Sequence, residues 1–221
     1  MNSPEGISFD TAPNPRHALI WLHGLGADGS DFVPVIPELG LPAGTALRCI
    51  FPHAPLQPVS CNGGYVMRAW YDILSLSPLE RRIDTAGLQA SCALVEALIA
   101  REEARGIPAS RIVLAGFSQG GAVAYSTALA RSGALAGVVA LSTYIPAPEL
   151  LGQLPQHRQL PVFAAHGDAD EVVAPALGLA ARDLLLAGGL QPEWHSYPMG
   201  HEVCLEEIRD LGRWLVPLLE G

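Results

Sequence analysis

Short hydrophobic runs alternate along the chain with longer segments in which hydrophobic residues recur every three or four positions. Runs of a few hydrophobic residues bounded by loop-forming residues are typical of strands in a buried sheet. We therefore predict strands at 18–22, 47–51, 111–115, 137–141, 161–165 and 193–197.

The longer segments predict helices, and the clearest of them covers residues 85–105. Its hydrophobic residues fall on one helical face, namely Leu88, Cys92, Val95, Leu98 and Ile99. Asp84 is a typical N-cap for this helix, and Gly106 is a typical residue at its end. Further helices are predicted at 119–131, 175–187 and 202–219.

Strands that alternate with helices of this length indicate an α/β fold with a mostly parallel central sheet and helices on both faces. A chain of 221 residues suits one domain, which we expect to cover 1–221. The Pro-rich segment 52–58 is predicted to be a loop and not a linker, because the alternation resumes after it. The closely spaced elements leave little chain for a large cap domain.

The composition argues against several classes of protein. Lys and Arg number 13 and Asp and Glu number 22, which gives a formal net charge of −9. This balance disfavours binding to nucleic-acid phosphates or to an anionic membrane surface. No segment resembles a secretory signal or a membrane span, and the four cysteines lack paired spacing. We therefore expect a cytoplasmic protein with reduced cysteines and without stable membrane insertion.

Ser118 lies in the sequence Gly-Phe-Ser-Gln-Gly, between a predicted strand and a predicted helix. This is the G-x-S-x-G pattern in the strand–turn–helix context of a nucleophile elbow. Side chains at positions 116 and 120 would collide with the neighbouring strand or helix, and the helix N-terminus would direct N–H groups at a developing oxyanion. The pattern therefore favours Ser118 as a nucleophile over a serine that only caps the helix.

A serine nucleophile needs a base, and in this type of fold the chain order is serine, acid, histidine. Of the two late histidines, His195 lies inside a predicted strand, whereas His201 lies in the loop after it and is the predicted base. The acid is expected in the loop after strand 161–165. Asp168 and Asp170 both qualify there, although either is also typical of an Asx turn or a helix cap.

An oxyanion needs two backbone N–H donors. One is expected from Gln119, the residue after the nucleophile, and the other from Leu25 in the loop 23–29 that follows the first predicted strand.

Two segments of the chain partly match cofactor-binding or metal-binding motifs, but neither match is complete. The sequence GLGADG in that loop also matches the dinucleotide pattern G-x-G-x-x-G. However, Pro34 and Pro37 oppose the helix that this pattern requires, and the next strand ends in Pro52 and His53 without an acid for the ribose. HEVCL begins like the zinc motif H-E-x-x-H, but Leu205 occupies the position of the second ligand. We therefore expect neither a dinucleotide cofactor nor a metal.

Several motifs recur together in one known family: LHGLGADGSDF, PHAPLQPV with AWYDI, GFSQGG, HGDADEVV and GHEV. From about residue 18 to the C-terminus, the chain resembles the carboxylesterase and acyl-protein thioesterase family of serine hydrolases. The resemblance implies a compact α/β-hydrolase fold without a large lid. It also implies hydrolysis of carboxylic esters, thioesters or lysophospholipids without a cofactor.

The resemblance assigns roles to individual residues. It implies Ser118 as nucleophile, Asp170 and not Asp168 as acid, and His201 as base. Leu25 and Gln119 match the oxyanion donors.

Residues around the cleft match the family less closely. Tyr144 and Val172 align loosely with its acyl pocket, and Trp70 and Tyr71 are expected either to shape the cleft or to pack a loop onto the sheet. Glu171 stands where many relatives have proline, a departure that bears on the loop holding Asp170.

The expected reaction is hydrolysis of small esters with short to medium acyl chains, and of thioesters, in a shallow open cleft. Long-chain acyl proteins and lysophospholipids are the alternative substrates. A non-catalytic or dinucleotide-binding protein is the alternative from another class, and the complete set of reactive residues argues against it. Ser118 likewise disfavours the lactone-opening enzymes that use cysteine. The sequence does not distinguish a monomer from a homodimer.

Overall fold

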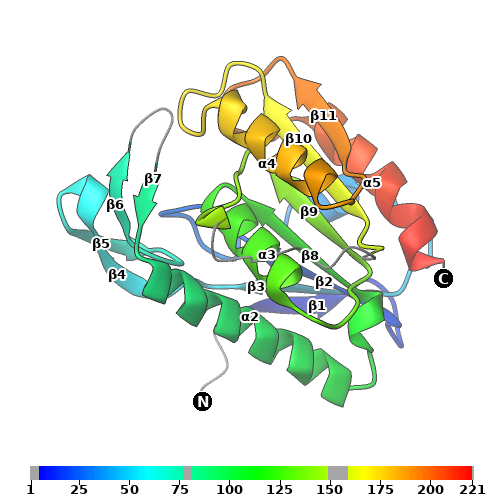
Figure 1. Ribbon diagram of the computed structural model, residues 1–221. Coiled ribbons are helices and arrows are strands. Elements are labelled where there is room, and N and C mark those ends of the chain that lie inside the picture. Colours follow the sequence, from blue (N-terminus) through cyan, green and yellow to red (C-terminus); the bar gives the residue numbers. More distant parts are fainter. Residues whose placement is uncertain (1–4, 77–80, 149–158, 221) are drawn as a thin grey trace.

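The computed structural model of the chain describes residues 5–76, 81–148 and 159–220. Its centre is a seven-stranded sheet in the order β1-β3-β2-β8-β9-β10-β11 (Figure 1). All neighbouring strands are parallel except β1, which runs antiparallel to β3. The strands are β1 (Gly6–Asp10), β2 (His17–Leu22), β3 (Leu47–Pro52), β8 (Ile112–Phe117), β9 (Gly137–Leu141), β10 (Val162–Gly167) and β11 (Glu193–Tyr197).

Helices cover both faces of this sheet. Helices α2, α3 and α4 pack on the face seen in front in Figure 1, and α1 and α5 pack on the reverse face. The helices are α1 (Val35–Glu38), α2 (Thr85–Ala104), α3 (Gln119–Ala130), α4 (Pro175–Ala187) and α5 (Leu205–Leu219). The expected α/β architecture is therefore confirmed.

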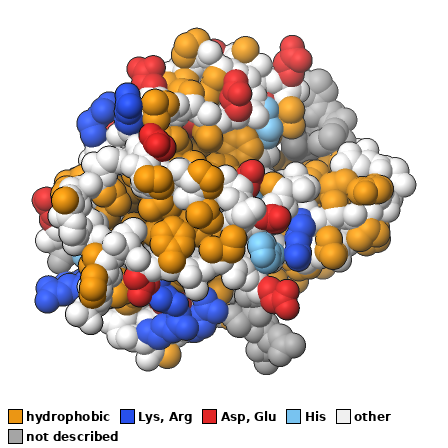
Figure 2. All heavy atoms as spheres, turned by 180° about the vertical axis from the view of Figure 1, so that it is seen from behind, with side chains coloured by type: hydrophobic (Ala, Val, Ile, Leu, Met, Phe, Trp, Pro, Cys, Tyr) orange, Lys and Arg blue, Asp and Glu red, His pale blue; other side chains and the backbone are white. Residues whose placement is uncertain are grey.

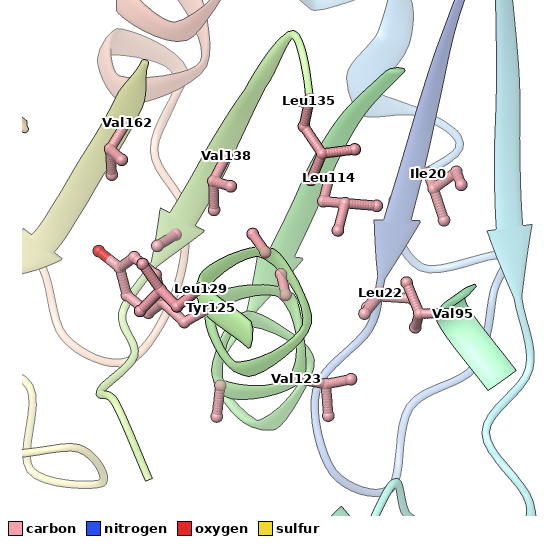
Figure 3. Close-up of a cluster of buried hydrophobic side chains, with 14 of the residues drawn as sticks. Ile20, Leu22, Val95, Leu114, Val123, Tyr125, Leu129, Leu135, Val138 and Val162 are labelled. Carbon is pink, nitrogen blue, oxygen red and sulfur yellow. The ribbon is translucent and has the colours of Figure 1, made fainter. Parts of the chain in front are cut away.

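The strand residues alternate between two hydrophobic cores, because successive side chains of a strand point to opposite faces. Ile20 of β2 joins the front core, whereas its neighbours Leu19 and Trp21 join the reverse core. Figure 3 shows the front core, where Leu114, Val138 and other strand side chains meet α3. The reverse face carries hydrophobic side chains among scattered acidic and basic ones (Figure 2).

All six predicted strands are present, with ends shifted by up to two residues. The helix expected at 202–219 begins only at Leu205, with Cys204 as its N-cap, so residues 202–204 belong to the loop after His201. The helix expected at 85–105 ends at Ala104. As predicted, Asp84 caps its start by accepting a hydrogen bond from the Ala86 N–H, and Gly106 follows its end with a φ of 96°.

The prediction of a loop over 52–58 was wrong in part. Residues Leu56–Val59 form β4, which pairs with β5 (Tyr65–Arg68), and a second hairpin joins β6 (Ile73–Leu76) to β7 (Arg81–Ile83). Pro58 lies inside β4, and a proline normally argues against a strand unless the strand lies at an edge. Two short 3₁₀ turns cover Ser60–Asn62 and Ala109–Arg111.

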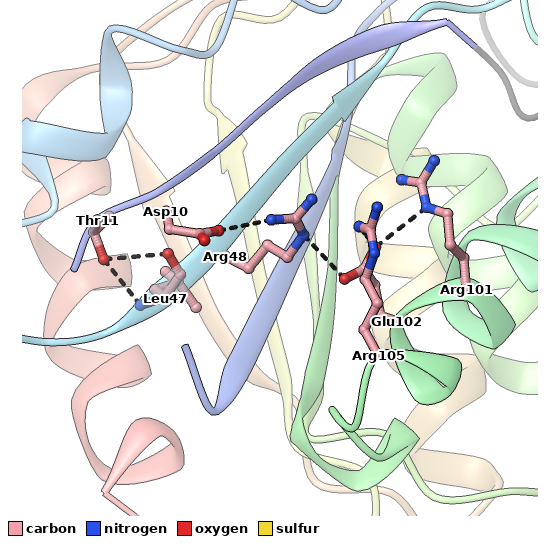
Figure 4. Close-up of polar contacts among 7 residues, drawn as sticks. All are labelled: Asp10, Thr11, Leu47, Arg48, Arg101, Glu102 and Arg105. Atoms are coloured by element: carbon pink, nitrogen blue, oxygen red, sulfur yellow. Dashed lines mark hydrogen bonds and ion pairs between the residues drawn. The ribbon is translucent and has the colours of Figure 1, made fainter. Parts of the chain in front are cut away.

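Helix α2 is tied to the sheet by buried charge. The Glu102 carboxylate forms ion pairs with three guanidinium groups: Arg48 of β3 at 3.0 Å, Arg105 at 2.8 Å and Arg101 at 3.2 Å (Figure 4). Arg48 also pairs with Asp10 of the edge strand β1. This cluster therefore fixes α2, β3 and β1 relative to one another.

The cysteines and the apolar character of the helices bear on two further expectations. The four cysteines carry free thiols, as predicted. Within the described part of the chain, no helix has the length and apolar character needed to cross a membrane.

Candidate active site

Ser118 stands at the turn between β8 and α3. Its backbone has a φ of 54° and a ψ of −120°, a sparsely populated conformation for a residue with a side chain. A Cβ atom at Gly116 would lie 2.4 Å from the Gly120 carbonyl carbon, and one at Gly120 would lie 2.3 Å from the Leu22 oxygen. Only glycine fits these two positions, as the sequence pattern predicted, and the tight turn presents the serine at the end of the strand.

The Ser118 side chain does not cap α3. Its Oγ lies 2.9 Å from His201 Nε2, and His201 Nδ1 lies 2.7 Å from Asp170 Oδ2. An ionised carboxylate only accepts hydrogen bonds, so Nδ1 carries the proton and Nε2 is left to accept one from the serine hydroxyl. The three side chains thus form a continuous hydrogen-bonded chain.

Asp170 lies in the turn after β10 and its side chain is fully buried. Its Oδ1 accepts the N–H groups of Val172 and Val173 at 2.9 and 2.8 Å. Burial by itself raises the pKa of this carboxyl, but hydrogen bonds from His166, His201 and the Val173 N–H outweigh it and hold the pKa well below the usual range. The carboxylate is therefore ionised throughout the neutral range.

The other candidates from the sequence lie away from this chain of hydrogen bonds. Asp168 is exposed to solvent, and its N–H donates to the Tyr197 oxygen. His195 lies inside β11, where its Nε2 is 2.8 Å from Glu193 Oε1. The structure thus brings Asp170 and His201 to Ser118, and leaves Asp168 and His195 outside.

The loop 23–29 after β2 lies beside the serine. A Cβ at Gly24 would be 3.5 Å from Ser118 Cβ, so the backbone of this loop passes next to the serine, and Leu25 is the residue that follows. The segment after this loop forms only the four-residue helix α1, which is too short for the dinucleotide motif.

Two histidines that the sequence analysis did not assign hold this loop. His23 is buried and its Nε2 accepts the Ala54 N–H at 3.0 Å, so its Nδ1 carries the proton and donates to the Gly24 oxygen at 2.7 Å. His53 Nδ1 accepts the Gly29 N–H at 2.9 Å. The Leu-His-Gly and Pro-His motifs contain these residues, but no local pattern shows that their rings bond backbone groups across the loop.

Gln119 is the first residue of α3, where a backbone N–H has no acceptor inside the helix. Its buried side chain bridges a distant loop: Oε1 accepts the Trp70 N–H and Nε2 donates to the Tyr71 oxygen, both at 2.8 Å. The Trp70 indole is 1% exposed and donates to the His23 oxygen at 2.9 Å. Of the two alternatives for Trp70, the structure therefore places it in the packing of the loop and not on the cleft surface.

An apolar groove of about 570 Å³ lies between the β6–β7 hairpin, the loop after β9 and α4. Its lining includes Leu74, Ile83, Tyr144, Leu177, Ala181 and Leu184. Tyr144 follows Thr143, whose Oγ1 donates to the Ser118 carbonyl at 2.6 Å, so one residue links this wall of the groove to the backbone of the serine. Val172, the second expected pocket residue, is 56% exposed beside Asp170 and does not line this groove.

His166 lies at the site, although the chain order excludes it as the base. His166 of β10 is buried, and its Nε2 lies 2.8 Å from the Val173 oxygen and 3.4 Å from Asp170 Oδ2. It precedes Asp170 in the chain and so failed the order required of the base. The order rule identifies the base and gives no information on other histidines that contact the acid.

Two curated proteins with the same name are similar to this chain over most of its length. The chain is 40% identical over 217 residues to acyl-protein thioesterase 1 of Mycosarcoma maydis, a match that covers 91% of this chain and 90% of that protein. It is also 40% identical over 205 residues to acyl-protein thioesterase 1 of Neurospora crassa, covering 87% and 84%.

Solved structures have the same fold. The crystal structure of Arabidopsis thaliana SOBER1 superimposes with a TM-score of 0.86 at 30% identity, over 92% of this chain and 99% of that one. The crystal structure of Zea mays acyl-protein thioesterase 2 gives a TM-score of 0.82 at 30% identity, over 97% and 100%. The Phospholipase/Carboxylesterase family model matches residues 10–217. The chain therefore belongs to the phospholipase/carboxylesterase family and is an ester hydrolase with the α/β-hydrolase fold.

Proposed function

We propose that the chain hydrolyses carboxylic esters and thioesters through an acyl-enzyme on Ser118. The observation that carries this proposal is the hydrogen-bonded chain from Asp170 Oδ2 through His201 to Ser118 Oγ, with distances of 2.7 and 2.9 Å. This arrangement supplies a nucleophile, a base and a group that orients the base.

In the first half of the reaction, His201 Nε2 takes the hydroxyl proton while Ser118 Oγ forms a bond to the acyl carbon. The carbonyl oxygen becomes an oxyanion and accepts hydrogen bonds from the backbone N–H groups of Leu25 and Gln119. His201 then returns its proton to the alcohol or thiol, which leaves as the bond to the acyl carbon breaks. Asp170 remains ionised and stabilises the charged imidazole between these steps.

In the second half, His201 removes a proton from water, and the resulting hydroxyl attacks the acyl carbon. The same two N–H groups hold the oxyanion. His201 returns the proton to Ser118 Oγ, and the carboxylic acid leaves. No cofactor enters either half.

The groove lined by Tyr144 supports binding of the acyl chain. Its volume lies within the range of pockets that hold drug-sized ligands, and its lining is mostly apolar, with Arg82 and Thr85 as polar members. The Tyr144 hydroxyl lies 2.9 Å from that of Tyr71. We propose short to medium acyl chains as substrates. The groove and the names of the thioesterase relatives favour long-chain thioesters as the second candidate.

The test is a series of p-nitrophenyl esters of increasing acyl length, measured beside acyl thioesters. Ser118→Ala should lower turnover on all of them by about 10⁶-fold with the fold retained. Ala180→Trp narrows the groove at an exposed position of α4, so it should lower kcat/KM for the longer chains and spare the acetyl ester.

Leu179→Trp is the matched control, because this residue is also exposed on α4 but does not line the groove. Robust turnover by Ser118→Ala would contradict the proposed chemistry. Equal effects of Ala180→Trp on all chain lengths would contradict the groove as the acyl site.

A further inference from the structure

His166 is a second histidine against the acid of the proposed site, and the reaction steps above do not use it. Its Nε2 lies 2.8 Å from the Val173 oxygen and 3.4 Å from Asp170 Oδ2, the oxygen that also accepts the hydrogen bond of His201. A carbonyl oxygen only accepts, so Nε2 carries a proton. That single N–H faces both oxygens.

The His166 ring is held in one place by neighbours on two elements. It stacks on the Trp194 ring of β11, with centroids 6.2 Å apart and planes 20° apart. On the side of α4, a Cβ at Gly178 would lie only 2.5 Å from Nδ1, so the helix approaches the ring closely. The ring has little room to rotate, and its N–H stays directed at the turn that carries Asp170.

The charged groups around this ring are few among the described residues. Asp170 faces the ring directly, and His201 lies on the far side of the carboxylate. Arg182 of α4 lies over the Trp194 ring, 5.6 Å from its centroid. The main polar effect of His166 is therefore on the Asp170 carboxylate and on the Val173 carbonyl.

We propose that His166 is a positioning residue that aims Asp170 Oδ2 at His201 and limits the negative charge that this oxygen presents to the imidazole. The inference rests on the proposed function. The two oxygens of Asp170 are held differently: Oδ1 by two backbone N–H groups, and Oδ2 by the His201 hydrogen bond at 2.7 Å and a longer contact of 3.4 Å with the His166 N–H, whose shorter bond goes to the Val173 oxygen. Because His201 gains and loses charge during each turnover, a second donor on Oδ2 keeps the carboxylate aligned when the bond to His201 changes strength.

Removal of this donor has a defined consequence. A carboxylate oxygen that loses a hydrogen bond carries more negative charge toward His201 and holds the proton on that imidazole more tightly. A larger fraction of His201 is then protonated at neutral pH and unable to accept the Ser118 proton, and Asp170 is free to tilt. Turnover falls and its rise with pH moves to higher pH, while substrate affinity is unchanged because His166 lies behind the acid and away from the groove.

The experiment compares pH profiles of kcat and kcat/KM for the wild type and four variants with a neutral short-chain ester. His166→Phe removes the donor and keeps an aromatic ring for the stack on Trp194, so kcat should fall about 10- to 100-fold, the value of one hydrogen bond to a charged group. Its KM should stay unchanged, and its profile should move to higher pH. His166→Gln keeps an N–H of similar reach and should recover a large part of kcat and the wild-type profile.

Gly178→Ala provides a second route to the same result. It keeps the imidazole and improves helix propensity, but its methyl group displaces the ring. It should therefore lower kcat in the same direction as His166→Phe even where the fold is retained. His195→Gln, a histidine on the neighbouring strand without contact to Asp170, is the matched control and should leave kcat and the profile unchanged.

The proposal is overturned if folded His166→Phe keeps the wild-type kcat and pH profile, or if it loses activity that His166→Gln does not recover. If His166→Phe does not fold, His166→Gln and Gly178→Ala decide: wild-type kcat and profile in Gly178→Ala overturn the proposal. Loss of hydrolysis in these variants while the wild type is active bears on His166 alone. An inactive wild type would instead contradict the proposed function.

Discussion

Asp170 and Glu102 are both fully buried carboxylates, yet their partners differ in kind. Glu102 on α2 is surrounded by the guanidinium groups of Arg48, Arg101 and Arg105 (Figure 4). Asp170 is held by two backbone N–H groups and two imidazoles. Arginine is always charged, whereas histidine gains and loses a proton near neutral pH.

In the proposed mechanism, this difference separates a structural charge from a catalytic one. At Glu102 the negative charge is balanced permanently by cations, so no charge is left to respond to a reaction. At Asp170 the neighbours are backbone and imidazole N–H groups, and in the proposed mechanism the carboxylate is available to stabilise the positive charge that appears on His201. The partners of a buried carboxylate thus indicate its role better than its burial does.

The largest effect on turnover, and the sharpest test of this comparison, is expected from Asp170→Asn. The amide keeps the shape but cannot hold His201 in the required tautomer, so turnover should fall about 10⁴-fold while the protein remains folded. Asp168→Asn, in the same turn but exposed, is the control and should change kcat little. If the two effects were reversed, the acid of the site would be Asp168.

Glu102→Gln should give the opposite result, a loss of stability without a loss of chemistry. Removing the buried carboxylate leaves Arg48 with only Asp10 as an ion-pair partner, and the free energy of unfolding should fall by about 3 kcal/mol. Urea denaturation measures this, and kcat per folded molecule should equal that of the wild type. Glu96→Gln breaks the more exposed pair with Arg131 and should cost less than about 1 kcal/mol. Equal costs for the two variants would remove the distinction between buried and exposed pairs.

A third carboxylate, Glu207 on α5, extends the comparison to a buried acid without a hydrogen-bond partner for either oxygen among the described residues. Burial raises its pKa to about 8, whereas an exposed glutamate titrates near 4.5. Between these values the folded protein binds a proton that the unfolded chain has released. The contribution of Glu207 to stability is therefore greatest at low pH and falls by up to about 1.4 kcal/mol per pH unit as pH rises through this range.

Glu207→Gln removes that dependence. Its advantage in unfolding free energy over the wild type should grow as the pH rises from 5 to 8, as followed by urea denaturation at each pH. A difference that stays constant over this range would show that Glu207 does not titrate in the folded state as expected.

The parts of the fold that the sequence predicted are those whose burial leaves a simple pattern. Strands such as β2 and β8 are buried on both faces and read as unbroken hydrophobic runs. The edge strand β1 alternates exposed and half-buried residues over five positions, and β4 contains Pro58, so neither gives such a run. Their pairing depends on partners distant in the sequence.

The residues of the site also divide into those that a local sequence pattern indicates and those that it does not. The glycines around Ser118 and the order of acid and base along the chain follow from local sequence, which is why Ser118 and His201 could be assigned from residues alone. Position in the loop favoured Asp170 over Asp168 only weakly, and the resemblance decided between them, because the turn that buries one and exposes the other depends on contacts with Tyr197 and Met199. The contact of His166 with Asp170 and the bridge from Gln119 to Trp70 are tertiary and leave no local signal.

The most direct test is labelling with a fluorophosphonate, which reacts with a serine only when a base activates it. Intact-mass measurement and peptide mapping should find one adduct per wild-type chain, on Ser118, and slower labelling in Asp170→Asn but wild-type labelling in Glu102→Gln. Ser118→Ala should remain unlabelled. An adduct on another residue, or undiminished labelling of Ser118→Ala, would contradict the assignment of Ser118 as the nucleophile.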